Sequence, residues 1–372
     1  MRKRDLTAAD KTTGYHIYHR NIPDPRCPFP EIPMLNRRSE TMLLLKRTVI
    51  LLIAAVMLVS SCAREERSKA ETDGRTEGKR RDLYFLISAL GANSYFYDHK
   101  MGLKTAGEHF GVETQYKGPP DLNMQAMIQA LELAVAREPG GIMIIGFEES
   151  LNNAVDKAVE AGIPVVTLDS DLPNSKRVAF IGTGNYDAGY KGGMTLADFV
   201  NGKGKVAILT KVGQPNLEER VRGYRDALAR FPDIEIARIA DTKSEVPMAA
   251  QVAAAVLAAV QDLAGFGCVE AAGGAGCATA LKEAGLAGKV KVVAMDRDND
   301  ILTYIKNGII DATVVQQTAL MPFYGLSILY QLNHCDIPIS SDNAGADVPG
   351  VPRVIDTGTI LVDRTNCEYF LR

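Results

Sequence analysis

Short, continuously apolar segments alternate with helical segments along most of this 372-residue chain, and this alternation constrains the fold more than any other feature. Strands that are buried on both faces are apolar throughout, and a helix between consecutive strands is typical of a parallel sheet. The pattern therefore predicts an α/β fold. The expected strands cover residues 83–88, 141–145, 164–168, 205–209, 234–239, 267–271, 290–294 and 312–315.

Helical patterns separate the first of these strands, at residues 94–110, 122–137 and 150–161. A glycine-rich break at residues 181–185 then interrupts the alternation, which resumes at residue 205. Two successive βα arrays predict two doubly wound lobes, each with a parallel sheet between layers of helices. The body from residue 82 onward is long enough for two medium-sized domains.

A short hydrophobic run lies upstream of this body. Residues 49–59 are apolar or small, Lys46 and Arg47 precede them, and Cys62 closes the run after two serines. A membrane-spanning helix needs roughly 20 apolar residues, so this run is too short to span a bilayer. The pattern resembles a bacterial lipoprotein signal, which implies that Cys62 carries the lipid. An ordinary secretory peptide or a short buried helix is the alternative.

This interpretation divides the N-terminal part of the chain. Residues 1–41 lack apolar periodicity, and we expect them to be a leader that is absent from the working protein, with translation starting at Met42 or Met34. Residues 42–61 are expected to be the lipoprotein signal peptide. Residues 62–81 are polar and charged after the cysteine, and they are expected to form the lipid anchor and a flexible tether.

Composition excludes some classes of function. The net charge of −3, with 23% charged residues, indicates no strong attraction to nucleic acid. No CxxC or His-Cys metal spacing occurs, so neither a metal nor another cofactor is expected. None of the five histidines lies at an expected strand end beside a serine or cysteine nucleophile, so no catalytic residues are predicted. The body contains four cysteines that allow three disulfide pairings: Cys268, Cys277, Cys335 and Cys367.

Ligands of open α/β sheets bind beyond the carboxyl ends of the strands, where this chain carries aromatic, carboxylate and amide side chains. The segment 93–96 follows the first strand, Asp169 and Asp171 follow another, and Asp296 and Gln316 follow two later ones. Carboxylates and amides hydrogen-bond hydroxyl groups, and aromatic faces stack on sugar rings. These positions predict a site for a polyhydroxylated ligand.

The order of these segments resembles that of the periplasmic sugar-binding proteins of ABC importers, in the type I, ribose-binding-like branch. The resemblance covers nearly all of residues 82–370. Each motif is weak alone, but five in the right order and spacing make a strong signal. The matching segments are Asn93-Ser-Tyr-Phe96, Ile163-Pro-Val-Val-Thr-Leu-Asp169, Glu219-Arg-Val-Arg-Gly-Tyr224, Val292-Val-Ala-Met-Asp296 and Ala312-Thr-Val-Val-Gln316.

The resemblance implies a role for each matching residue. Tyr95 and Phe96 would contact the sugar ring and Asn93 a hydroxyl group, while Asp169 and Asp296 would grip the sugar from opposite lobes. Gln316 would touch the ligand from the hinge, and Arg220 lies in the region of a second-lobe arginine. Plainer alternatives exist: the aromatic residues could pack in the core, Asp169 could cap a helix or turn, and Arg220 could face solvent.

The resemblance also implies three crossings between the lobes, near Thr183, Gln316 and Thr357. Lobe 1 would contain residues 82–183 and 317–357, and lobe 2 residues 184–316 and 358–372. The implied protein is a monomer, lipid-anchored in the periplasm or at the cell surface, which passes a monosaccharide or polyol to an ABC permease. The alternatives are a sugar sensor that feeds a membrane receptor, a carbohydrate-active enzyme, or the effector domain of a repressor.

The chain departs from the ribose binders at four positions. Gly146 and Gly273 replace polar residues, Met295 replaces a phenylalanine, and Glu218 stands where an arginine is common. Loss of these partners makes ribose itself doubtful. We expect a bulkier sugar or polyol to use the space beside the two glycines.

Overall fold

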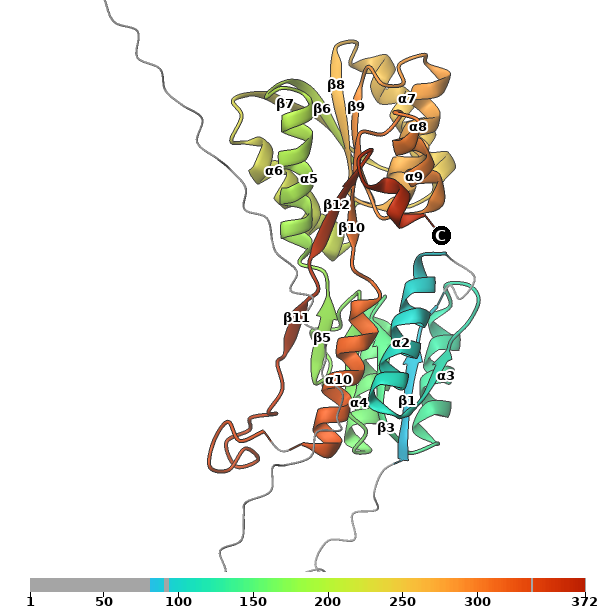
Figure 1. The fold of residues 1–372 in the computed structure, drawn as a ribbon, viewed down its shortest axis with the longest axis vertical. Coiled ribbons are helices and arrows are strands. Elements are labelled where there is room, and N and C mark those ends of the chain that lie inside the picture. The colour runs from blue at the N-terminus through green and yellow to red at the C-terminus, as the bar shows by residue number, and fades with distance from the viewer. Residues whose placement is uncertain (1–80, 90–93, 336, 372) are drawn as a thin grey trace, which may run out of the picture. The chain divides into compact units, whose positions relative to one another are not determined.

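The computed structural model describes residues 81–89, 94–335 and 337–371, all within the compact unit Gly78–Arg372. Cys62, Asn93, the expected leader and the signal peptide lie outside the described residues. The described chain forms two six-stranded sheets, each covered by helices on both faces (Figure 1). Among the described residues, no helix is long and apolar enough to cross a membrane.

The first sheet has the strand order β11-β5-β4-β3-β1-β2, and every pairing in it is parallel. Odd-numbered apolar residues of β1 pack toward α3 and α4, and even-numbered ones toward α2 and α10. We call this sheet and its helices lobe 1. Its elements are β1 (Arg81–Ile87), α2 (Tyr97–Phe110), β2 (Glu113–Lys117), α3 (Met124–Val135), β3 (Pro139–Ile145), α4 (Asn152–Glu160), β4 (Val165–Leu168), β5 (Ala179–Gly182), α10 (Leu320–His334) and β11 (Val354–Asp356).

The second sheet has the corresponding order β12-β10-β9-β8-β6-β7, and only β12 runs antiparallel, to β10. Helices α5 and α6 cover one face, and α7, α8 and α9 the other. This is lobe 2. Its elements are α5 (Asn185–Phe199), β6 (Lys203–Thr210), α6 (Pro215–Leu228), β7 (Asp233–Asp241), α7 (Val246–Ala259), β8 (Leu263–Cys268), α8 (Ala271–Glu283), β9 (Lys291–Met295), α9 (Asn299–Lys306), β10 (Ala312–Gln316) and β12 (Thr359–Asp363).

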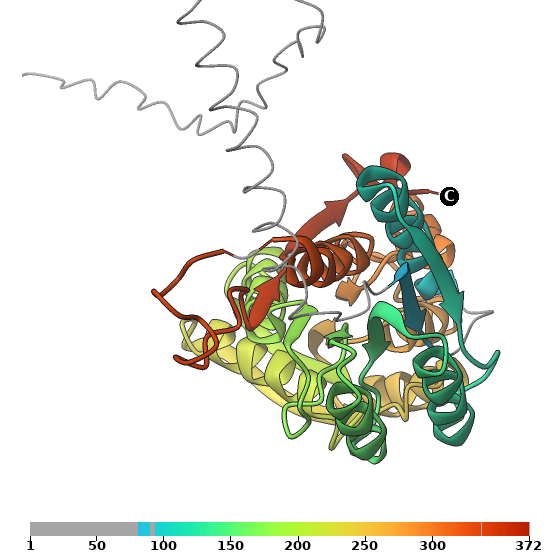
Figure 2. The same ribbon diagram turned by 90° about the horizontal axis from the view of Figure 1, so that it is seen from below.

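The chain passes between the lobes three times: from β5 to α5, from β10 to α10, and from β11 to β12. The predicted fold class, with two doubly wound lobes and three crossings, is therefore confirmed. The segment between α10 and β11 contains no helix or strand in its described residues, and it projects from lobe 1 in both views (Figures 1 and 2).

The structure corrects one predicted strand. Residues 267–271 were expected to be a strand, but β8 ends at Cys268 and α8 begins at Ala271. The Glu270 side chain accepts a hydrogen bond from the Ala272 backbone N–H and so caps α8, and the alanines that follow favour a helix. Strands β2, β5, β11 and β12 were not predicted from the sequence.

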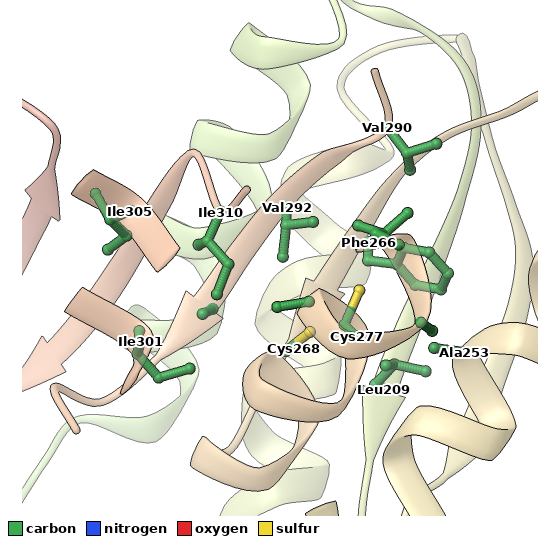
Figure 3. Packing of buried hydrophobic residues seen from close by; sticks show 14 of the residues in the cluster. Leu209, Ala253, Phe266, Cys268, Cys277, Val290, Val292, Ile301, Ile305 and Ile310 are labelled. Carbon is green, nitrogen blue, oxygen red and sulfur yellow. The ribbon is translucent and has the colours of Figure 1, made fainter. Parts of the chain in front are cut away.

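A large apolar core lies between the second sheet and helices α7, α8 and α9 (Figure 3). Cys268 on β8 and Cys277 on α8 are both buried in it. All four described cysteines are free thiols, and Cys335 alone among them is exposed.

Candidate ligand-binding site

Residues of both lobes line a cleft of about 660 Å³. Lobe 1 contributes residues beyond the carboxyl ends of β1, β3 and β4. Lobe 2 contributes residues beyond β6, β7, β8 and β9, and the last residue of β10. The structure brings six of the seven predicted ligand residues together around this cleft. They are Tyr95, Phe96, Asp169, Arg220, Asp296 and Gln316.

The two aspartates occupy equivalent places in the two lobes. Asp169 directly follows β4 and Asp296 directly follows β9, and these strands hold the same position in their sheets. Both residues have a left-handed backbone, with φ of 64° and 69°. Aspartate tolerates this conformation better than most residues, but it still costs free energy, and such strain is concentrated at functional sites.

A hydrogen-bonded network links these carboxylates across the lobes. The Tyr95 hydroxyl donates to Oδ1 of Asp169 at 2.6 Å. The Gln316 side-chain amide donates to Oδ1 of Asp296 at 2.9 Å and to the Tyr95 hydroxyl at 3.1 Å. Burial and the charges of the two aspartates hold the pKa of Tyr95 well above its usual range, so the phenol stays neutral and keeps its proton to donate.

Arg220 orients this network from α6. It is buried, so the alternative that it faces solvent is wrong. Its guanidinium donates to the Asn185 side chain at 2.8 Å, to the Val269 carbonyl at 2.9 Å and to Oε1 of Gln316 at 2.9 Å. Because Arg220 occupies the amide oxygen of Gln316, the amide nitrogen must point toward Asp296 and Tyr95.

The cleft is rich in buried carboxylates. Burial raises the pKa of Asp296 to about 6, although the Arg220 charge and the Gln316 hydrogen bond oppose this. Burial also raises the pKa of Glu270, which accepts a hydrogen bond from the Thr242 hydroxyl at 2.9 Å. Among the described residues that line the cleft, the only cations are Arg220 and Arg297, and both already donate to protein oxygens.

An aromatic wall closes the lobe 1 side of the cleft. The Tyr95 and Phe96 rings meet edge to face with centroids 5.0 Å apart, and Phe96 meets Phe147 at 6.0 Å. Phe96 is only 3% exposed, so most of its surface packs in the core and little of it faces the cleft. Both interpretations of Phe96, as a core residue and as a residue of the cleft wall, therefore hold in part.

Phe147 and Glu270 are among the cleft residues that the sequence analysis did not predict. Glu270 follows β8 closely, as a ligand residue should, but the misplaced strand end at residue 271 concealed this position. Phe147 follows β3 directly after Gly146, and its apolar side chain carried no signal of a binding site.

The two glycines leave no space for a larger sugar. A Cβ atom on Gly146 would lie 2.6 Å from the Ser170 carbonyl oxygen, and one on Gly273 would lie 3.2 Å from the Cβ of Cys268. Neither residue lines the cleft. Protein atoms fill the positions that were expected to admit a bulkier ligand, so that expectation was wrong.

Comparison with known proteins places this geometry in a family. Residues 83–334 match the family model described as periplasmic binding protein domain. A sugar ABC transporter sugar-binding protein from Bacillus halodurans is 32% identical in sequence, with a TM-score of 0.74, over 77% of this chain and 99% of the other. An arabinose binding protein from Geobacillus stearothermophilus is 31% identical, with a TM-score of 0.74, over 78% of this chain and all of the other.

A curated relative, the D-apiose import binding protein of Paraburkholderia graminis, is 29% identical over 207 residues. That match covers 54% of this chain and 64% of the relative, so it spans less than two thirds of the relative's length. The family model by itself covers more than half of the chain. The two solved structures share the fold of this chain along almost their entire length. The chain therefore belongs to the periplasmic binding protein family, whose members work outside the cytoplasm.

Proposed function

We propose that this protein is the substrate-binding component of an ABC sugar importer, and that it holds a neutral monosaccharide or polyol between its lobes. The observation that carries the proposal is the pair Asp169 and Asp296, presented from equivalent strand ends of opposite lobes. Carboxylates accept hydrogen bonds from sugar hydroxyls, and two of them on opposite walls can hold opposite edges of one ring. The sugar would be bound and released without chemical change.

The charge of the cleft supports an uncharged ligand. Asp169, Asp296 and Glu270 line it, while the guanidinium groups of Arg220 and Arg297 are engaged with protein oxygens. A phosphorylated or acidic sugar would bring a further negative charge among these carboxylates without a cation to meet it, which costs free energy. Neutral sugars should therefore bind far better than their acidic derivatives.

The names of similar proteins suggest which sugars to test first. The relatives described above are named for D-apiose and arabinose, and a solute binding protein from Burkholderia graminis, 29% identical, was solved in complex with D-arabinose. These names support pentoses as the first ligands to examine. A protein 28% identical is named for glucose and galactose, so hexoses belong in the same screen.

The remaining parts of the proposal concern cellular context. We propose that Cys62 carries a lipid, that residues 62–81 tether the body to a bacterial membrane, and that a monomer delivers its sugar to a permease in that membrane. The support is the sequence pattern before Cys62 and the family of the body. Metabolic labelling with a fatty acid, in the parent and in Cys62→Ala, tests the anchor directly.

Thermal unfolding of the purified protein with and without candidate ligands tests the binding. The panel should contain pentoses, hexoses, polyols, uronic acids and sugar phosphates, and calorimetry should follow each hit. Any ligand that binds the native state raises the midpoint of unfolding by mass action. Stabilisation by a neutral sugar supports the proposal, while stabilisation by sugar phosphates alone contradicts it.

A further inference from the structure

A second connection between the lobes lies beside the proposed sugar site. Arg297 directly follows Asp296 in lobe 2, and Asp98 stands in the first turn of α2 in lobe 1. The Arg297 guanidinium donates to Oδ2 of Asp98 through Nη2 at 2.5 Å and through Nε at 3.1 Å. We call this contact the inter-lobe ion pair.

Both side chains are held in place by further contacts. Nη1 of Arg297 donates to the Phe370 carbonyl of lobe 2 at 3.2 Å. The Thr318 hydroxyl, in the crossing between β10 and α10, donates to Oδ2 of Asp98 at 3.2 Å. The Asp98 carboxylate therefore receives donors from lobe 2 and from a hinge segment at once. Because the partners are already oriented, little side-chain entropy remains to be lost when the pair forms.

The inter-lobe ion pair is largely shielded from solvent. The Asp98 side chain is 10% exposed and the Arg297 side chain 25%. Exposed ion pairs contribute little because water and salt screen them, but pairs that are mostly buried are screened much less. Leaving one partner unpaired in such a place is unfavourable. The contact can therefore bias the position of one lobe against the other.

The pair also adjoins the ligand residues. A cavity of about 10 Å³ separates it from them, and its lining includes Tyr95, Asp296 and Gln316 as well as Asp98 and Arg297. The chain links the same groups, since Asp98 lies one helical turn after Tyr95 and Arg297 is the neighbour of Asp296. Any separation of the lobes that breaks the ion pair must also move the two walls of the sugar site apart.

We propose that Asp98 and Arg297 are positioning residues that set the equilibrium between joined and separated lobes, and thereby set the affinity for all ligands by a common factor. This proposal rests on the proposed binding function. A binding site that exists in only a fraction of the molecules has its apparent affinity reduced by that fraction. Substituting a residue that contacts the sugar alters which sugars the protein prefers, whereas breaking the inter-lobe ion pair should change every affinity by the same factor.

The experiment compares the purified parent protein with Asp98→Asn, Arg297→Gln and the double variant, and it has a readout that needs no ligand. Small-angle X-ray scattering of the ligand-free proteins should show a larger radius of gyration in both single variants than in the parent. Asp262→Asn is the matched control, because it breaks the Lys205–Asp262 ion pair within lobe 2 and removes one negative charge, as Asp98→Asn does. Its scattering should equal that of the parent.

Calorimetry with at least two sugars supplies the second readout. Each single variant should raise the dissociation constants of both sugars by the same factor, on the order of tenfold, so that the ratio of the two constants is unchanged. In the double variant, the factor by which affinity falls should be smaller than the product of the factors in the two single variants, because the two residues act through one contact. Arg297→Lys keeps the charge, so its affinity for each sugar should lie between those of the parent and Arg297→Gln.

Two results would overturn the inference. One is unchanged scattering and unchanged affinity in both single variants, and the other is a change in the ratio between sugars, which would mean that these residues contact the ligand. If no sugar binds the parent, the proposed function fails, but the scattering still decides whether the ion pair joins the lobes. Circular dichroism and thermal unfolding identify a variant that has lost its fold, in which case Arg297→Lys decides.

Discussion

At the scale of single residues, the affinity should depend most on the two aspartates at the strand ends. We expect Asp169→Ala and Asp296→Ala to leave the fold intact and to weaken sugar binding by about 2 kcal/mol or more, roughly thirtyfold, since buried hydroxyls lose a charged acceptor. Asp198→Ala, at an exposed position on α5 outside the cleft, is the matched control. Parent-like affinity in both cleft variants, measured by calorimetry, would show that the cleft is not the sugar site.

Asp296 should also make binding depend on pH. Its pKa of about 6 means that about nine tenths of the groups are ionised at pH 7 and about one tenth at pH 5. The carboxylate is the better acceptor, so affinity should fall about tenfold between pH 7 and pH 5. The groups that set this pKa besides burial are Arg220, Gln316, Asp169 and Asp298.

The effect of this pKa on stability has the opposite sign. A carboxyl group whose pKa is raised on folding stabilises the folded state most at low pH, and this contribution is lost as the pH rises through about 6.

Asp296→Asn should remove most of the pH dependence of binding, and any remainder then reports on Glu270, whose pKa burial also raises. An equally steep dependence in the Asn variant would show that Asp296 is not the titrating group.

At the scale of elements, the crossing of α5 and α6 determines where Arg220 points. Gly189 on α5 lies so close to α6 that a Cβ atom there would stand 2.0 Å from the Arg220 carbonyl oxygen. We expect Gly189→Ala to force the helices apart, to lower the free energy of unfolding by about 1–3 kcal/mol, and to weaken sugar binding through Arg220. Urea unfolding and calorimetry would measure the two effects.

A glycine in α8 provides the comparison for this variant. The nearest atom to a Cβ on Gly273 would be 3.2 Å away, and alanine also favours the helix. Gly273→Ala should therefore change stability by less than Gly189→Ala. If the two variants unfold at the same urea concentration, the close approach of α5 and α6 does not limit stability.

At the scale of the whole molecule, the thiols report on cooperative unfolding. Cys335 is exposed, while Cys268, Cys277 and Cys367 are buried in the core of lobe 2. A maleimide should label Cys335 in the native protein and the other three only under conditions that unfold lobe 2. Peptide mapping by mass spectrometry after timed labelling would test this. Labelling of Cys268 or Cys277 as fast as Cys335 would mean that the core opens locally.

The sequence by itself determined the architecture and six of the residues that line the cleft. Continuous apolar strands and intervening helices led to two doubly wound lobes, because buried parallel strands leave a local pattern that does not depend on their partners. Five cleft residues at strand ends followed from the same pattern, and Arg220 on α6 followed from the family resemblance. Their contact with a ligand stays a prediction. The signal peptide and Asn93 lie outside the described residues and stay predictions too.

Only the tertiary structure decided how these side chains face one another. Residues 221 positions apart, Tyr95 and Gln316, share a hydrogen bond, and Asp98 meets Arg297 across 199 positions. The structure also showed that Gly146 is packed against backbone atoms, so no larger ligand fits beside it. A local sequence pattern indicates whether a residue lies in a helix or a strand and whether it is buried. Contacts between distant segments depend on how whole lobes pack, and no local pattern encodes that packing.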